Sequence, residues 1–203
     1  MSKEFSRYGI LFVVSAPSGA GKSTLCDALR QTPDFVYSVS CTTRPPRAGE
    51  IAGEDYHFIA EPDFLARVAA GEFLEHANVH GQLYGTLREP IVSNLRDGVD
   101  VLIDIDTQGA AAIRAFDDAF VRQALADVFI MPPDLDELRR RLTKRGTETP
   151  EQIELRLTTA AREMELWRDY RYTIISKSIE EDLQKFRHIM GAERYLSSRM
   201  ILA

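Results

Sequence analysis

The chain has 203 residues, 44% hydrophobic and 28% charged, and carries a formal net charge of −6 at pH 7. This length allows one domain with a full hydrophobic core, and the negative charge argues against nucleic acid as a partner, because nucleic-acid-binding proteins need an excess of Lys and Arg on one face. The early apolar run is too short for a membrane span or a signal peptide, so we expect a cytoplasmic protein with no membrane partner.

The first strong local pattern is a glycine-rich turn that follows the apolar residues 10–14 and leads into a helical pattern. Strand, glycine-rich turn and helix in this order are typical of a phosphate-binding loop, in which backbone N–H groups and the helix N-terminus surround phosphate oxygens. We expect Lys22 to contact the outer phosphates and Ser23 to offer its hydroxyl to Mg²⁺. The predicted loop consists of Ala16, in place of the motif's leading Gly, and of Pro17, Ser18, Gly19, Ala20, Gly21, Lys22, Ser23 and Thr24.

Apolar runs along the chain predict the strands of a central sheet. Helical patterns separate them, so we expect an α/β fold with a mostly parallel sheet that is flanked by helices on both faces. Ligands of such sheets bind at the carboxyl ends of the strands, where Asp104 and Asp106 follow an apolar run and point to the same side. The runs are residues 10–14, 35–39, 99–105, 128–131 and 172–175.

Two segments do not fit this alternation. Residues 38–95 begin with a basic, proline-rich turn and continue with short strand patterns, which predicts an inserted subdomain of short antiparallel strands and one or two helices. Residues 134–167 read as a helical hairpin, in which Arg141 and Arg145 share a face at i,i+4 spacing and Arg156 follows on the second helix. By itself this pattern favours a solvated charged hairpin, but beside a phosphate loop it also indicates a lid with cations for a phosphoryl group.

The last segment, residues 179–202, has the apolar spacing of one long amphipathic helix. Core packing explains that spacing, and so does contact with a second copy of the chain. The sequence therefore leaves a homo-oligomer open.

Five separated motifs occur along the chain in a fixed order. They are APSGAGKS at residues 16–23, SCTTRPPR at 40–47 with GE at 49–50 and DY at 55–56, YGT at 84–86, DID at 104–106 with QG at 108–109, and RGTET at 145–149. Together they resemble the guanylate kinase family, whose members transfer a phosphoryl group from ATP to GMP. The resemblance implies a P-loop NTPase fold over residues 8–190, with a core (8–37, 96–133 and 168–203), a GMP-binding subdomain (38–95) and a helical lid (134–167).

The same resemblance assigns roles to individual side chains. Arg44, Arg47, Tyr56 and Tyr84 resemble the residues that hold the GMP phosphate, which suits guanidinium and phenol donors. Lys22, Arg47 and the lid arginines Arg141, Arg145 and Arg156 resemble the catalytic cations, and Asp104 lies where an aspartate is near Mg²⁺ in many phosphate-loop proteins.

The predicted readers of the guanine base are Glu75 and Asp106, with the hydroxyls of Ser40 and Thr86 beside them. Guanine carries two donors on one edge, N1–H and the 2-amino group, and carboxylates accept from both. Adenine has an acceptor there and no 2-amino group, so the carboxylates would stay unpaired. A phosphate monoester, with a second pKa of about 6, is already an anionic nucleophile, so no general base is needed and the four histidines have no expected catalytic role.

Other functions share part of this pattern. A ribose bisphosphate kinase would not need the full set of GMP-site residues, and a catalytically inactive guanylate-kinase-like binding domain would have a degraded phosphate loop and lid. A GTPase switch is disfavoured because the guanine-reading string Asn-Lys-x-Asp is absent. Ser176 and Lys177 stand where the family usually has Asn-Asp, so this chain departs from the family pattern on the adenosine side of ATP.

Overall fold

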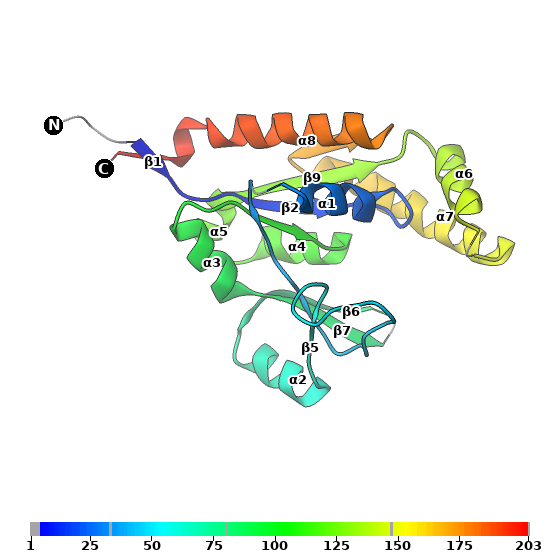
Figure 1. The fold of residues 1–203 in the computed structure, drawn as a ribbon, viewed down its shortest axis with the longest axis horizontal. Coiled ribbons are helices and arrows are strands. Elements are labelled where there is room, and N and C mark those ends of the chain that lie inside the picture. The colour runs from blue at the N-terminus through cyan, green and yellow to red at the C-terminus, as the bar shows by residue number, and fades with distance from the viewer. Residues whose placement is uncertain (1–4, 33, 80, 147, 203) are drawn as a thin grey trace.

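The computed structural model describes residues 5–32, 34–79, 81–146 and 148–202, which form two β-sheets, a two-stranded ribbon and surrounding helices (Figure 1). The strands are β1 (Phe5–Arg7), β2 (Leu11–Ser15), β3 (Val36–Tyr37), β4 (Cys41–Thr42), β5 (His57–Phe58), β6 (Phe73–Val79), β7 (Gln82–Leu87), β8 (Val101–Asp104), β9 (Leu125–Met131), β10 (Tyr172–Ile175) and β11 (Met200–Leu202). The helices are α1 (Lys22–Arg30), α2 (Glu61–Ala69), α3 (Arg88–Arg96), α4 (Thr107–Ala115), α5 (Ala119–Ala124), α6 (Leu135–Arg145), α7 (Pro150–Met164) and α8 (Ile179–Arg194), with short 3-10 turns η1 (Glu165–Asp169) and η2 (Ser197–Arg199).

The central sheet has the strand order β10-β9-β2-β8-β3, and all its neighbouring strands run parallel. Its five strands are those that the apolar runs predict, although β3 is limited to two residues and β9 begins earlier than expected. Strand β2 is buried along its whole length at the centre of the sheet. The predicted parallel α/β fold is therefore confirmed.

Helices cover both faces of this sheet. On one face, Leu25 and Leu29 of α1 and Phe186 of α8 pack in the same cluster as Phe12 of β2. On the other face, α3, α4 and α5 cover the sheet, with buried residues such as Ile113 (Figure 1). Among the described residues, no helix is long and apolar enough to cross a membrane.

A second, smaller sheet has the order β5-β4-β7-β6 and lies below the central sheet in Figure 1. Its β4–β7 and β6–β7 pairs are antiparallel as expected, but β4 and β5 run parallel. A long loop, rather than a hairpin turn, joins β4 to β5, and parallel neighbours need such a connection. Phe64 of α2 stacks on Phe73 of β6 at a centroid distance of 4.5 Å and forms the core of this unit.

The helices α6 and α7 form the expected hairpin at one end of the molecule (Figure 1). Asp134 caps α6 by accepting from the backbone N–H of Glu137 at 2.7 Å, and Gly146 ends that helix with a φ of 68°. Thr149 and Gln152 form a full capping box at the start of α7. The two helices share a small core of their own, made of Leu138, Leu142, Ile153, Leu157 and Ala160.

The C-terminal segment differs from the expected single helix, because α8 ends at Arg194 and the chain then turns. Strand β11 pairs antiparallel with β1, which brings both ends of the described chain together (Figure 1). Beyond the turn, the buried guanidinium of Arg199 donates to the Glu193 carboxylate and to the carbonyl oxygen of Gln123. Tyr195, the first residue after α8, is 87% exposed.

Candidate active site

The predicted phosphate loop joins β2 to α1 at the carboxyl edge of the central sheet. Gly19 and Gly21 have φ values of 87° and 101°, in the left-handed region that glycine adopts without strain. The amino group of Lys22 donates to the carbonyl oxygen of Ile105 at 3.0 Å and lies 3.6 Å from the Asp104 carboxylate. The loop therefore has the backbone of an anion-binding nest, with its lysine directed to the neighbouring strand end.

A cavity of about 290 Å³ lies where this edge meets the small sheet. All of its lining residues except Ala77, Val79 and Ile105 were predicted from the sequence as site residues. The structure thus brings together residues from the phosphate loop, from both sheets and from the end of β8. The lining consists of Lys22, Ser23, Ser40, Tyr56, Glu75, Ala77, Val79, Tyr84, Asp104, Ile105 and Asp106.

Glu75 of β6 is held in this cavity by hydroxyl groups. The Thr86 hydroxyl donates to its Oε1 atom at 2.6 Å, and the Ser40 hydroxyl lies 3.2 Å from the Thr86 hydroxyl. Burial, with a smaller contribution from the Asp106 charge, raises the pKa of Glu75 to about 7. The second oxygen of the Glu75 carboxylate is left for another partner.

Asp106 caps α4 and stands close to Glu75. Its Oδ1 atom accepts from the backbone N–H of Gly109 at 2.8 Å, which fixes the carboxylate at the start of the helix. A pair of carboxylates, one from the small sheet and one from the core, therefore faces the same cavity. The pair suits a ligand with two neighbouring hydrogen-bond donors.

Arg44 is held by partners within the small-sheet unit. Its guanidinium forms a bidentate pair with Glu50 at 2.8 and 3.0 Å, and its Nε donates to the Tyr84 hydroxyl at 3.2 Å. The Glu50 hydrogen bond raises the pKa of Arg44, and the same bond lowers the pKa of Glu50. Tyr56 packs edge-on against Tyr84, with ring centroids 5.8 Å apart.

Arg47 lies on the same loop with an exposed side chain, and its backbone N–H donates to Glu50 at 2.6 Å. Neither Arg44 nor Arg47 lines the cavity, although Arg44 contacts Tyr84, which does. The sequence analysis gave Glu50 no role, although it stands in a quoted motif. Its function here is to orient the basic loop.

Two of the arginines predicted to belong to a lid, Arg141 and Arg156, contact the phosphate loop. Arg141 donates to the carbonyl oxygen of Ala20 and to the Ser176 hydroxyl, each at 3.0 Å. Arg156 donates to the Ser18 hydroxyl at 3.1 Å and lies 3.3 Å from the carboxylate of Glu148. The side chain of Arg145 lies outside the described residues.

Glu163, near the end of α7, contacts the phosphate loop, and no role was predicted for it from the sequence. Its carboxylate accepts from the backbone N–H of Ser18 at 3.2 Å, and burial raises its pKa. A carboxylate of the lid therefore lies on a backbone N–H of an anion-binding loop. A single Glu in a charged helix gives no local signal of such a contact.

Tyr37 of β3 is a second missed neighbour of the site. Its hydroxyl donates to the Asp104 carboxylate, and its ring lies under the Arg30 guanidinium at 3.6 Å. A smaller cavity of about 150 Å³ adjoins these residues. No local signal in the sequence identifies Tyr37, because its place beside β8 is set by the pairing of the folded strands.

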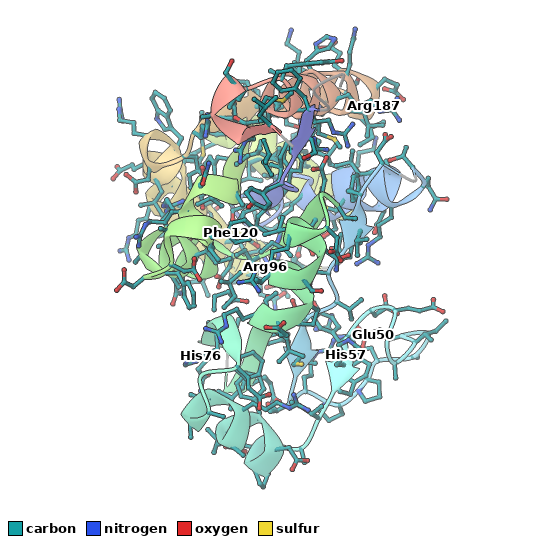
Figure 2. The ribbon with its side chains drawn as sticks, turned by 90° about the vertical axis from the view of Figure 1, so that its left-hand side faces the viewer. Glu50, His57, His76, Arg96, Phe120 and Arg187 are labelled. Atoms are coloured by element: carbon teal, nitrogen blue, oxygen red, sulfur yellow. The ribbon has the colours of Figure 1, made fainter. Side chains whose placement is uncertain are left out.

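None of the described histidines lines the cavity of the candidate site. His57, His76 and His188 are exposed, and the first two lie with Glu50 in the small-sheet part of the molecule (Figure 2). His80 lies outside the described residues.

A phosphate loop at the carboxyl edge of a parallel sheet, with lid arginines against it, defines a phosphate-loop nucleotide-binding protein with a kinase-like architecture. A solved gluconokinase from Sinorhizobium meliloti 1021 shares this fold with a TM-score of 0.51 at 17% identity, over 92% of this chain and 94% of that one. That likeness concerns the fold alone.

Closer similarity identifies the family. The guanylate kinase family profile matches residues 8–193. The guanylate kinase of Maricaulis maris (strain MCS10) is 47% identical over 191 residues, which cover 93% of this chain and 85% of that protein. The crystal structure of guanylate kinase from Anaplasma phagocytophilum superimposes with a TM-score of 0.79 at 35% identity, over 98% of this chain and 93% of that one. The chain belongs to the guanylate kinase family.

Proposed function

We propose that this chain transfers the γ-phosphoryl group of ATP to GMP and dGMP, giving ADP and GDP or dGDP, in purine nucleotide metabolism. The observation that carries the proposal is one cavity lined by both Lys22 of the phosphate loop and the carboxylates of Glu75 and Asp106. A donor phosphate and a guanine base can therefore bind within reach of each other.

The carboxylate pair selects the base. The Glu75 Oε1 atom is occupied by the Thr86 hydroxyl and the Asp106 Oδ1 atom by the Gly109 N–H, which leaves one oxygen of each for the N1–H and 2-amino donors of guanine. Adenine would leave buried carboxylate oxygens unpaired, which costs about 1–3 kcal/mol for each such group. Ser40, next to Thr86, is the proposed donor to guanine O6.

The basic loop holds the acceptor phosphate. Arg44 and Arg47 supply guanidinium groups that match phosphate oxygens, and Tyr56 and Tyr84 supply phenol donors. Glu50 already fixes the plane of the Arg44 guanidinium, so less side-chain freedom is lost when the phosphate binds. The bound phosphate is itself the nucleophile.

The donor side combines the phosphate loop with the lid. Lys22 and the loop of residues 16–24, through the backbone N–H groups of its residues other than Pro17, bind the ATP phosphates, and Arg141, Arg145 and Arg156 neutralise the charge that develops during transfer. Arginines in this role contribute about 10³- to 10⁵-fold to rate in other phosphoryl-transfer enzymes. Contacts of Arg141 and Arg156 to residues 18 and 20 support this assignment.

Mg²⁺ fits the oxygen donors at this edge. The Ser23 hydroxyl and the Asp104 carboxylate line the same cavity, and both are hard oxygen ligands of the kind that Mg²⁺ prefers. Mg²⁺ sites of this kind use one or two protein side chains together with substrate phosphates. When bound, Mg²⁺ would neutralise phosphate charge during transfer.

The domain division follows the same logic: residues 38–95 bind GMP, residues 134–167 form the lid, and the remainder of residues 8–203 forms the core. The retained Lys22, Ser23 and Arg156 give no support to a catalytically inactive binding domain. A cytoplasmic location, a possible homo-oligomer and the lack of a nucleic-acid partner stay predictions of the sequence.

Replacing Lys22 tests the donor assignment. We expect Lys22→Met to abolish turnover, because the point charge on the outer phosphates is lost, while the GMP dissociation constant stays within about threefold of wild type. Calorimetric titration with GMP and a coupled assay of ADP formation measure the two effects. Loss of GMP binding together with turnover would contradict the separation of donor and acceptor sites.

A further inference from the structure

The two carboxylates of the base pocket meet at a single glycine in α4. The N–H of Gly109 donates to Oδ1 of Asp106 at 2.8 Å. A Cβ atom built on Gly109 would lie 3.0 Å from Oε2 of Glu75 and 3.4 Å from Oδ1 of Asp106. Gly109 thus lies beside both carboxylates, although Glu75 belongs to β6 of the small sheet and Asp106 is the N-cap of α4.

The conformation of Gly109 does not explain why a glycine stands here. Gly109 lies in the first turn of α4, where its backbone has a helical conformation that any L-residue can adopt. Its φ is not in the left-handed region. A glycine inside a helix is less favourable than alanine. The absence of a side chain is therefore more important than the freedom of the backbone.

The space over Gly109 is filled by Oε2 of Glu75, and Cδ1 of Ile105 would lie 3.3 Å from the added Cβ. Oε1 of Glu75 is held by the Thr86 hydroxyl at 2.6 Å, so Oε2 can move only by a turn of the carboxylate about that hydrogen bond, into the cavity that Glu75 lines. A methyl group 3.0 Å from Oε2 is closer than ordinary van der Waals contact. An added methyl would require Oε2 to shift by a few tenths of an ångström, which changes the direction of the Glu75 carboxylate relative to Asp106.

We propose that Gly109 is a specificity-determining positioning residue, which sets the spacing of the Glu75 and Asp106 carboxylates so that both accept from guanine at once. This inference rests on the proposed function, because it assumes that the two carboxylates read the base. The role has two parts: the N–H of Gly109 tethers Asp106, and its missing side chain admits Oε2 of Glu75. The donor site lies on other residues and is unaffected.

The test is Gly109→Ala, with Gly191→Ala as the matched control. Gly191 lies inside α8 with no atom within 4 Å of a built Cβ, so its substitution changes helix propensity alone. We expect Gly109→Ala to raise the KM for GMP about tenfold or more, while the KM for ATP and the melting temperature stay close to wild type. Gly191→Ala should leave both KM values unchanged. An unchanged KM for GMP, or an equal rise in both KM values with a lowered melting temperature, would overturn the proposal.

A double-mutant cycle shows whether the effect passes through Glu75. Calorimetry gives the GMP dissociation constant of wild type, Gly109→Ala, Glu75→Ala and the double variant. We expect Gly109→Ala to weaken GMP binding in the wild-type background and to have less than a twofold effect once Glu75 is Ala. Equal effects in both backgrounds would contradict the assigned role. If the wild-type protein neither binds nor phosphorylates GMP, the proposed function fails, and that outcome is distinct from a Gly109 variant that behaves like wild type.

Discussion

Glu75, the proposed reader of the guanine base, also makes the free energy of unfolding depend on pH. Its carboxyl is desolvated in the unliganded protein, and the nearby Asp106 adds a like charge, so its pKa is raised to about 7 from an ordinary value of 4.5. Between these two pH values the folded state keeps a proton that the unfolded state loses. The contribution of Glu75 to the free energy of unfolding therefore falls as the pH rises from about 4.5 to about 7.

Glu75→Gln tests this dependence, because glutamine does not titrate. Relative to wild type, we expect the variant to gain about 2–3 kcal/mol of unfolding free energy between pH 5 and pH 8. Urea denaturation at the two pH values gives the difference, and Glu54→Gln, at an exposed position, is the control. A pH dependence that is the same in wild type and Glu75→Gln would show that Glu75 is ionised in the folded protein over this whole range.

At the scale of single elements, the α6–α7 hairpin, which is the proposed lid, contacts the phosphate loop through apolar side chains as well as through arginines. A Cβ atom at Gly19 would lie 2.7 Å from Leu142 Cδ2 and 3.2 Å from Leu138 Cδ1, so α6 packs directly on the glycine of the loop. Leu142 is also a member of the hairpin core with Ile153 and Leu157. Packing of the hairpin and the shape of the donor site are therefore coupled.

Leu142→Ala measures that coupling. We expect a loss of about 2–4 kcal/mol in unfolding free energy from the cavity, and a rise of severalfold in the KM for ATP with little change in the KM for GMP. Leu155→Ala is the control, because Leu155 is 69% exposed on the same hairpin and should cost less than about 0.5 kcal/mol. Equal changes in both KM values would refute a lid-specific effect.

Short sequence patterns predicted those structural elements that depend only on residues close together in the sequence. The glycines of the phosphate loop, the continuous apolar strands and the capping box of Thr149 and Gln152 need only neighbours in sequence. Strand β9 begins earlier than predicted because Asp127 interrupts its apolar run; the residue is buried as the partner of Arg114 at 2.8 Å. Nothing near Asp127 in the sequence signals that pairing.

The residues of the candidate site also fall into those that the sequence predicts and those that only the folded structure reveals. Motif residues such as Lys22, Glu75 and Asp106 could be identified as a set and do line one cavity. The contacts of Tyr37 with Asp104 and of Glu163 with Ser18 could not be predicted, because each joins residues that only the folded chain brings together.

At the scale of the whole molecule, buried ion pairs attach the first and last described segments of the chain to the core. Glu193 is 0% exposed and accepts from Arg199, which is itself 4% exposed, and Asp100 accepts from both Arg7 and Arg194. These pairs hold β1, β11 and α8 together at the end of the molecule opposite the lid (Figure 1). They explain why the last residues leave the helix that their apolar spacing predicts.

Glu193→Ala removes one partner of this arrangement. We expect a loss of about 3–5 kcal/mol in unfolding free energy, because the Arg199 guanidinium would remain buried without its counter-charge. The kcat measured well below the melting temperature should stay within about twofold of wild type, since the pair is remote from the cavity. Gln184→Ala, at an exposed position of α8, is the control, and a stability loss below about 1 kcal/mol would argue against a structural role for the pair.

Phosphorylation of guanine nucleotides, with Glu75 and Asp106 reading the base, is the activity that we propose for this chain. A coupled assay of ADP formation from ATP and Mg²⁺, with GMP, dGMP, AMP and ribose 1,5-bisphosphate as acceptors, tests it most directly. We predict turnover with GMP and dGMP and none above background with AMP or the ribose bisphosphate. Saturable GMP binding without turnover of any acceptor would contradict the account and favour a binding domain, and equal rates with GMP and AMP would contradict the carboxylate readout.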